Sequence, residues 1–177
     1  MNQVRPSLFR DALQVSSVRI AALGEADLDL LMQELLKAEA YRCCSPISEI
    51  RVNTEEKAKD DGCDAWSGSP GVKSDWLGET RTCWQLKAGI AGQPARLEGE
   101  VGKPLPTKTL QEDGRFVVVA SGSTNGVKGE EDRLAILKDE AKAANIPNDR
   151  IEVIGSERLA NWCNQHPAIA ARWAGRP

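Results

Sequence analysis

The stretch DGCDAWSGSPGVKSDWLGETRTCWQLKAG, residues 61–89, decides how the rest of the chain is organised. Its first part places Asp64 at the start of a short predicted strand. Its last part, residues 82–87 (TCWQLK), predicts a second strand, and a connection rich in Gly, Ser and Pro joins the two. Successive side chains of a strand point to opposite faces, so Gln85 and Lys87 share one face. If the two strands pair as a hairpin, Asp64, Gln85 and Lys87 meet at one place.

A carboxylate, an amide oxygen and an ammonium group at one place have a common chemical use. Carboxylate and amide oxygens are ligands for hard divalent cations such as Mg2+. An ammonium group beside them can orient a water molecule and offset negative charge that develops on a phosphoryl group. The three residues therefore predict a site for metal-dependent hydrolysis of a phosphodiester. The alternative is that Lys87 is an ordinary lysine at the edge of the sheet.

The same residues resemble a known family. Asp-Gly-Cys-Asp, ending at Asp64, and Gln-Leu-Lys, ending at Lys87, follow an acidic helix. This order resembles the PD-(D/E)xK nuclease superfamily and, within it, the Mrr-like restriction-endonuclease branch. The likeness spans roughly residues 28–87 and continues more weakly to the C-terminus. It implies an α/β chain with a restriction-endonuclease-like fold, in which helices flank a mixed central sheet.

The resemblance also implies roles for individual residues. Asp64, Gln85 and Lys87 would be catalytic. Asp64, the Gln85 amide oxygen and the backbone carbonyl of Leu86 would hold Mg2+ or Mn2+. Because Gln85 stands where related enzymes have a carboxylate, the site carries one negative charge fewer and should bind its metal more weakly.

A further metal ligand would come from the first helix of the family. Residues 24–41 predict that helix, because apolar residues recur in it at helical spacing. They are Leu28, Leu31, Met32, Leu35 and Leu36. Aligning the Leu-Leu pair and Tyr41 on the family pattern puts Asp29 where a glutamate is usual, and Glu34 is the alternative ligand. Either residue can equally be a solvated carboxylate on the helix surface.

Composition is typical of one ordinary globular domain. The 177 residues are 41% hydrophobic and 28% charged, which is enough to bury a core. No apolar run approaches the ~20 residues of a membrane helix, and residues 1–11 lack the features of a secretory signal. We therefore expect a cytoplasmic protein that does not enter a membrane, with residues 1–23 as an N-terminal extension packed on the core.

Charge and cysteine content bear on nucleic-acid binding and on disulfide or zinc sites. The formal net charge is −3, but residues 81–108 carry five basic and two acidic side chains, after a more acidic stretch. An acidic half that binds metal beside a basic half that grips a nucleic-acid backbone would suit a nuclease. On charge alone, two solvated faces are the favoured interpretation. Five cysteines without C-x-x-C spacing, and one histidine, argue against a disulfide framework or a structural zinc site. We expect the cysteines to be small buried hydrophobes.

The remaining chain predicts further strands and helices. Strands are expected at residues 47–52, 116–120 and 151–154, and helices at 129–145 and after an N-cap at Ser156. Residues 91–108 contain several Gly and Pro, so at most one short helix is expected there, near residues 96–101. The order strand, helix, strand, helix in this half predicts a parallel crossover beside the hairpin.

Two further features have more than one interpretation. Trp66 and Trp76 flank the hairpin connection, where they could stack on bases or, as we favour, pack at the rim of the core. Residues 121–129 (SGSTNGVKG) follow an expected buried strand, as a phosphate-binding loop would. Their glycine and lysine spacing departs from that of a P-loop, so a surface turn is the better interpretation.

Three functions are consistent with these observations. The first is a Mg2+-dependent DNA endonuclease, which the resemblance places as the effector domain of a bacterial antiphage defence system. Because one active site cuts one strand, such a domain would act as a homo-oligomer or together with a sensor module. The second is a catalytically degenerate nucleic-acid-binding module on the same fold. The third is a nucleotide-binding sensor built on residues 121–129.

Overall fold

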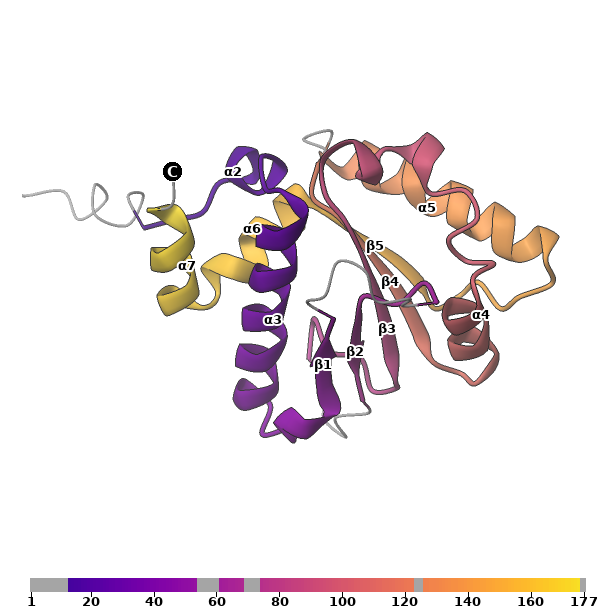
Figure 1. The fold of residues 1–177 in the computed structure, drawn as a ribbon, viewed down its shortest axis with the longest axis horizontal. Coiled ribbons are helices and arrows are strands. Elements are labelled where there is room, and N and C mark those ends of the chain that lie inside the picture. Colours follow the sequence, from indigo (N-terminus) through magenta and orange to yellow (C-terminus); the bar gives the residue numbers. More distant parts are fainter. Residues whose placement is uncertain (1–12, 54–60, 69–73, 123–125, 176–177) are drawn as a thin grey trace, which may run out of the picture.

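The computed structural model describes residues 13–53, 61–68, 74–122 and 126–175. Within them, five strands form one mixed sheet whose order follows the sequence (Figure 1). β1 (Ile50–Val52), β2 (Ala65–Ser67) and β3 (Thr82–Lys87) are antiparallel neighbours. β4 (Arg115–Ala120) and β5 (Ile151–Gly155) then pair in parallel with β3 and with each other. The predicted α/β class and the mixed sheet are confirmed.

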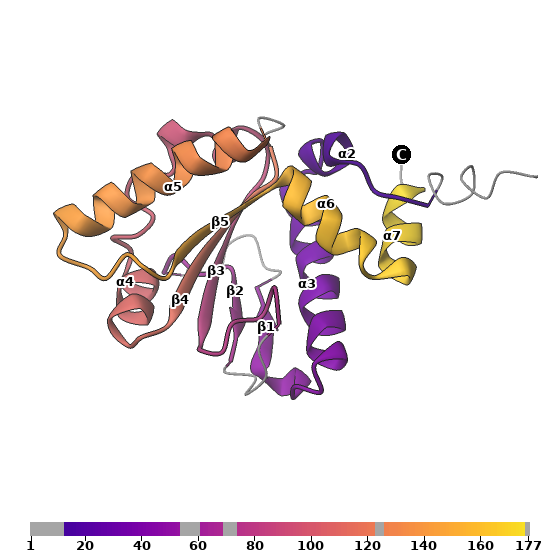
Figure 2. The ribbon, with the colours of Figure 1, turned by 180° about the vertical axis from the view of Figure 1, so that it is seen from behind.

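Helices cover both faces of the sheet (Figures 1 and 2). One face, here the α3 face, packs on α2 (Ser17–Ala21), α3 (Glu25–Arg42), α6 (Ser156–Asn164) and α7 (Pro167–Ala174). The other, here the α5 face, packs on α4 (Pro104–Gln111) and α5 (Gly126–Ala143). Three short 3-10 turns complete the description: η1 (Ile47–Glu49), η2 (Gly89–Gly92) and η3 (Pro94–Arg96).

The central strand β4 explains why the chain builds two cores. Phe116 and Val118 are buried on the α5 face, whereas Val117 and Val119 are buried on the α3 face. A continuous run of β-branched residues suits a parallel strand that is covered on both sides. The sequence-based prediction of a central buried strand is therefore confirmed, and β4 lies between β3 and β5.

Several predicted boundaries were wrong. The helix expected near residues 96–101 is instead α4, which starts at Pro104. Proline breaks the interior of a helix but fits its first turn, where its fixed φ is already helical. Residues 47–49 form η1 rather than strand, α5 starts at Gly126, and Gly155 rather than Ser156 is the N-cap of α6.

The described part of the expected N-terminal extension, residues 13–23, contacts α6. The Val15 backbone N–H donates to Asn164 Oδ1 at 2.9 Å, and Asn164 Nδ2 donates back to the Val15 carbonyl at 3.0 Å. Ile20 of α2 is fully buried. These contacts tie the segment to α6; residues 1–12 lie outside the described residues.

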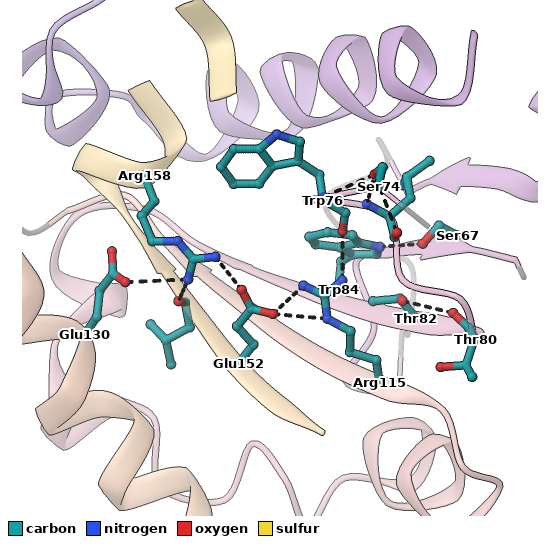
Figure 3. A network of polar contacts seen from close by, with 12 residues as sticks. Ser67, Ser74, Trp76, Thr80, Thr82, Trp84, Arg115, Glu130, Glu152 and Arg158 are labelled. Carbon is teal, nitrogen blue, oxygen red and sulfur yellow. Dashed lines mark hydrogen bonds and ion pairs between the residues drawn. The ribbon is translucent and has the colours of Figure 1, made fainter. Parts of the chain in front are cut away.

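A row of ion pairs crosses the α3 face beside Trp76 and Trp84 (Figure 3). Glu152 of β5 accepts hydrogen bonds from Arg115 of β4 and, at 2.5 Å, from Arg158 of α6. Arg115 also donates to the Trp76 carbonyl at 2.8 Å. The Trp76 ring stacks on Trp162, with ring centroids 4.7 Å apart. Trp76 is therefore a core residue, which supports packing rather than base stacking for this side chain.

The cysteines are all reduced, and their burial is mixed. Cys63, Cys83 and Cys163 are buried, whereas Cys44 is exposed and Cys43 is half-buried beyond the end of α3. Burial, together with the nearby charge of Glu34, raises the pKa of the Cys163 thiol to about 12. Burial also raises the pKa of Cys83, and a hydrogen bond with Cys63 adds to this shift. The buried thiols of Cys83 and Cys163 therefore stay protonated and unreactive.

Candidate active site

The hairpin of β2 and β3 positions the Asp64 carboxylate. The Asp64 backbone N–H donates to the Trp84 carbonyl at 2.8 Å, which places Asp64 opposite Gln85 in the antiparallel register. Just before it, Gly62 adopts a left-handed φ of +92°. A Cβ at this glycine would lie 2.6 Å from the Lys103 Cβ. The Asp-Gly-Cys-Asp turn therefore needs glycine for its backbone and for its contact with the segment that leads into α4.

The Asp64 side chain is engaged by the opposite strand. Its Oδ2 accepts a hydrogen bond from Gln85 Nε2 at 2.5 Å and another from the Leu86 backbone N–H at 2.6 Å. Gln85 is 3% exposed, and its Oε1 atom has no hydrogen-bond partner among the described residues. An unpaired buried oxygen costs about 1–3 kcal/mol. This oxygen is therefore the atom of the site most in need of a ligand.

Lys87 is held by a residue that the sequence interpretation missed. Its Nζ lies 2.7 Å from Glu100 Oε1, and the other Glu100 oxygen lies 2.6 Å from Lys103 Nζ. Glu100 is 6% exposed, whereas Lys103 is half-buried. A buried carboxylate between two lysines fixes the Lys87 ammonium group beside Asp64 and Gln85. A buried glutamate in a glycine-rich segment carries no local sequence pattern, so only the tertiary structure reveals it.

These side chains share one open cavity of about 410 Å³. Asp64, Gln85, Leu86, Lys87 and Lys103 line it, together with Glu25 in the first turn of α3 and its neighbours. Gln85 and Lys87 project onto the α5 face, whereas Leu86 packs in the core of the α3 face. The cavity opens where β3 ends and α3 begins. The structure thus brings Asp64, Gln85, Leu86 and Lys87 together, as the hairpin prediction required.

The two carboxylates expected from the first helix, Asp29 and Glu34, are not among the described residues that line the cavity, whereas Glu25 is. Glu34 contacts α7 instead: it pairs with Arg172 and accepts a hydrogen bond from Trp173 Nε1 at 2.8 Å. Asp29 is half-buried one turn after Glu25 on the same side of α3. Glu25 is thus the α3 carboxylate that lines the cavity. From the sequence, its position in the first turn of the helix indicated only a favourable interaction with the helix dipole.

The donors around the cavity suit a hard divalent cation. Asp64 and Glu25 supply carboxylates, and the orphaned Gln85 Oε1 supplies a neutral oxygen. In the described part of the chain, no group of three or more His, Cys, Asp or Glu side chains is placed to hold a metal. A site of this kind therefore depends on the Gln85 amide and backbone oxygen as well as on carboxylates, which weakens its affinity for metal.

The phosphate-loop interpretation of residues 121–129 gains little from the structure. Ser121 is buried, and its N–H donates to the Lys87 carbonyl at 3.0 Å. Gly122 packs against the backbone of Gly89, with no room for a Cβ. Residues 123–125 lie outside the described residues. The visible start of the loop is packed against the end of β3.

Comparison with known proteins does not add to these observations. The chain matches no family model, no curated protein and no solved structure. In the part of the chain that the structure describes, no helix is both long enough and apolar enough to span a membrane.

Proposed function

We propose that this chain is a divalent-metal-dependent DNA endonuclease of the PD-(D/E)xK type, with a restriction-endonuclease-like sheet. The observation that carries the proposal is the Asp64 cavity. There a carboxylate, a buried amide oxygen without a partner and an anchored lysine lie side by side on two paired strands. The order of sequence motifs supports the same conclusion, because Asp-Gly-Cys-Asp and Gln-Leu-Lys supply these groups.

Each residue has a distinct role in this proposal. Asp64, Gln85 Oε1 and the Leu86 carbonyl would hold Mg2+ or Mn2+. Glu25, which lines the cavity, replaces Asp29 or Glu34 as the helix carboxylate of this proposal. The cation would polarise the phosphoryl oxygen and lower the pKa of a bound water. Lys87 orients that water and offsets the charge that develops on phosphorus. Lys103, at the rim of the cavity, attracts the phosphodiester backbone.

A second candidate is a nucleic-acid-binding module whose site has lost catalysis. Two observations favour it: Asp64 Oδ2 already accepts two hydrogen bonds, and Lys87 is paired with Glu100. Such a protein would bind nucleic acid without cutting it. The two candidates differ in one measurable property, which is cleavage that depends on a divalent metal.

The test is cleavage of supercoiled plasmid with Mg2+ or Mn2+. We expect the wild-type protein to nick or linearise DNA, and we expect EDTA, Asp64→Ala and Lys87→Ala each to abolish cleavage. Removal of a group that stabilises transition-state charge typically lowers the rate about 100- to 1000-fold. Glu98→Gln, an exposed carboxylate near the site in sequence, is the matched control and should cut normally.

Two results would contradict an endonuclease with its active site in the Asp64 cavity. Salt-sensitive DNA binding without cleavage at high protein concentration would favour the binding module. Cleavage that survives both substitutions would place the active site elsewhere.

The biological setting is part of the proposal. We propose that the domain is the effector of a bacterial antiphage defence system, acting in the cytoplasm as a homo-oligomer or with a sensor module. One Asp64 cavity cuts one strand, so cleavage of both strands requires two copies. Nicking by monomers and linearisation by a cross-linked dimer would distinguish these states.

A further inference from the structure

We propose that Trp66, Arg81 and Arg51 form a surface that binds single-stranded nucleic acid and leads into the Asp64 cavity. This inference deepens the proposed function, because it names the form of the substrate, and it rests on that function. The surface is an open hollow of about 440 Å³ on the edge of the sheet. Its lining consists of Ser48, Glu49, Arg51, Trp66, Gly68 and Arg81.

The hollow and the Asp64 cavity lie on the same face of the sheet. Ala65 packs into the core of the α3 face and Trp66 against that of the α5 face, so Asp64 and Trp66 both project from β2 onto the α5 face. Asp64 and Trp66 are two residues apart, which is about 7 Å along a β-strand and about two steps along a nucleic-acid strand. One short oligonucleotide therefore reaches both the hollow and the Asp64 cavity.

The helices that pack on the α5 face, α4 and α5, leave room for an oligonucleotide over β1 and β2. α4 packs on β3 and β4, and α5 packs on β5. Over β1 and β2, the α5 face instead carries Trp66, which is half-buried, and its register partner Arg51, which is exposed. β1 is the edge strand of the described sheet, and the described residues of α4 and α5 pack on β3, β4 and β5 rather than on β1 or β2.

The stack of Arg81 on Trp66 identifies the kind of ligand. The Arg81 guanidinium carbon lies 3.7 Å from the centre of the Trp66 ring, and Arg81 is exposed. A guanidinium group that lies over an indole ring is a platform on which an unpaired base can stack. A duplex keeps its bases stacked on one another, so this platform selects single strands or opened ends.

Charge complements the platform. Arg51 and Arg81 supply two positive charges around the hollow, and Glu49 supplies one negative charge. Phosphates beside the stacked base would pair with Arg51. The surface thus combines base stacking with backbone attraction, the two terms that dominate binding of single strands without sequence preference.

The test measures binding in EDTA, so that no cleavage occurs. The probes are a short fluorescent oligothymidylate and an abasic strand of the same length, which has phosphates but no bases. We expect Trp66→Leu to weaken oligothymidylate binding about tenfold, the effect of losing one base–aromatic stack, and to leave the abasic strand unchanged. Arg81→Gln removes both the platform and one positive charge, so it should weaken oligothymidylate binding more than abasic binding. Arg51→Gln removes charge alone and should weaken both probes equally. Trp66→Phe, which keeps an aromatic plane, should restore the preference for bases.

Matched controls separate stacking from charge and from folding. Arg96→Gln removes one exposed positive charge elsewhere and should not change the ratio between the two probes. Thermal unfolding of each variant reports its stability. Because Arg81 is exposed, Arg81→Gln tests the platform even where a Trp66 substitution perturbs folding.

The outcomes distinguish this surface from the proposed catalysis. Glu98→Gln, which changes an exposed carboxylate that lines neither cavity, should bind both probes like wild type. A wild-type protein that prefers oligothymidylate through Trp66 and Arg81, but cuts nothing with Mg2+, supports the surface and contradicts the endonuclease. Cleavage of DNA with equal binding of both probes, or preferential binding of blunt duplex, overturns the surface and leaves the endonuclease standing. Equal affinity for oligouridylate and oligothymidylate would extend the substrate to RNA.

Discussion

Glu100 determines where the ammonium group of Lys87 lies. Its two oxygens pair with Lys87 and Lys103 at 2.7 and 2.6 Å, and Glu100 itself is almost fully buried. Charges paired out of water interact more strongly than surface pairs, but they leave an isolated charge behind when one partner is removed. Glu100 therefore acts on the proposed reaction through Lys87, as a positioning residue.

We predict that Glu100→Gln lowers metal-dependent cleavage about 10- to 100-fold, the range typical of groups that orient the residues of a metal site. The loss should appear in kcat more than in KM, because the substrate still contacts Lys103 at the rim of the cavity. Urea unfolding should show a parallel loss of stability. Glu98→Gln, two residues away and exposed, is the control. A variant that is destabilised but cuts with wild-type kcat would limit Glu100 to a structural role.

Among the elements of the fold, the turn before β2 packs the hairpin of β2 and β3 against the start of α4. Gly62 has φ of +92°, and a side chain there would collide with Lys103 and approach Pro106 at 3.1 Å. The Leu105 N–H donates to the Asp61 carbonyl at 3.2 Å across the same junction. The motif glycine is thus required by packing as well as by backbone conformation.

We predict that Gly62→Ala destabilises the protein by more than the about 1–3 kcal/mol expected for a strained left-handed residue alone. Gly99→Ala is the matched control, because Gly99 has a similar φ of +87° but open space around its Cβ position. At about 2–4 °C per kcal/mol for a chain of this size, thermal unfolding resolves the difference. Equal shifts in Tm for the two variants would show that the contact with Lys103 is unimportant.

At the scale of the whole molecule, two carboxylates join distant elements and make stability depend on pH. Glu39 of α3 is fully buried, pairs with Arg42 at 2.5 Å and lies 3.2 Å from the His166 ring before α7. Burial alone would raise the pKa of Glu39, but hydrogen bonds from Arg42 and Ser74 and nearby positive charge lower it overall. The pKa of Glu152 is lowered in the same way: burial opposes the shift, and Arg115 and Arg158 outweigh it.

A carboxyl group whose pKa is lower in the folded state stabilises that state above its unfolded pKa, here near 4.5. This stabilisation disappears as pH falls from there through the folded pKa. We therefore predict that wild-type stability drops below about pH 4.5. Glu39→Gln and Glu152→Gln should be less stable than wild type at pH 7 and converge with it in acid. Urea unfolding between pH 7 and pH 3 measures the stability of each variant, with the exposed Glu131→Gln as the control. Plots of stability against pH that stay parallel to the wild-type plot would contradict the prediction.

Local patterns in the sequence were enough for the central elements. Alternation in TCWQLK correctly predicted β3, the run FVVVA correctly predicted the buried β4, and helical spacing correctly predicted α3. Each pattern reports the burial of neighbouring residues, so it can be read without knowing the rest of the fold. The prediction failed at α4, because a proline in a first turn looks the same in sequence as a proline that ends a helix.

The sequence by itself determined that Asp64, Gln85 and Lys87 lie together, because strand alternation and a hairpin depend on residues close in the chain. Only the tertiary structure decided which α3 carboxylate reaches them, that Glu100 anchors Lys87, and that Arg81 stacks on Trp66. These contacts depend on how α3 crosses the sheet and where the segment before α4 returns to β3. Such geometry results from the packing of whole elements, which no local pattern of residues encodes.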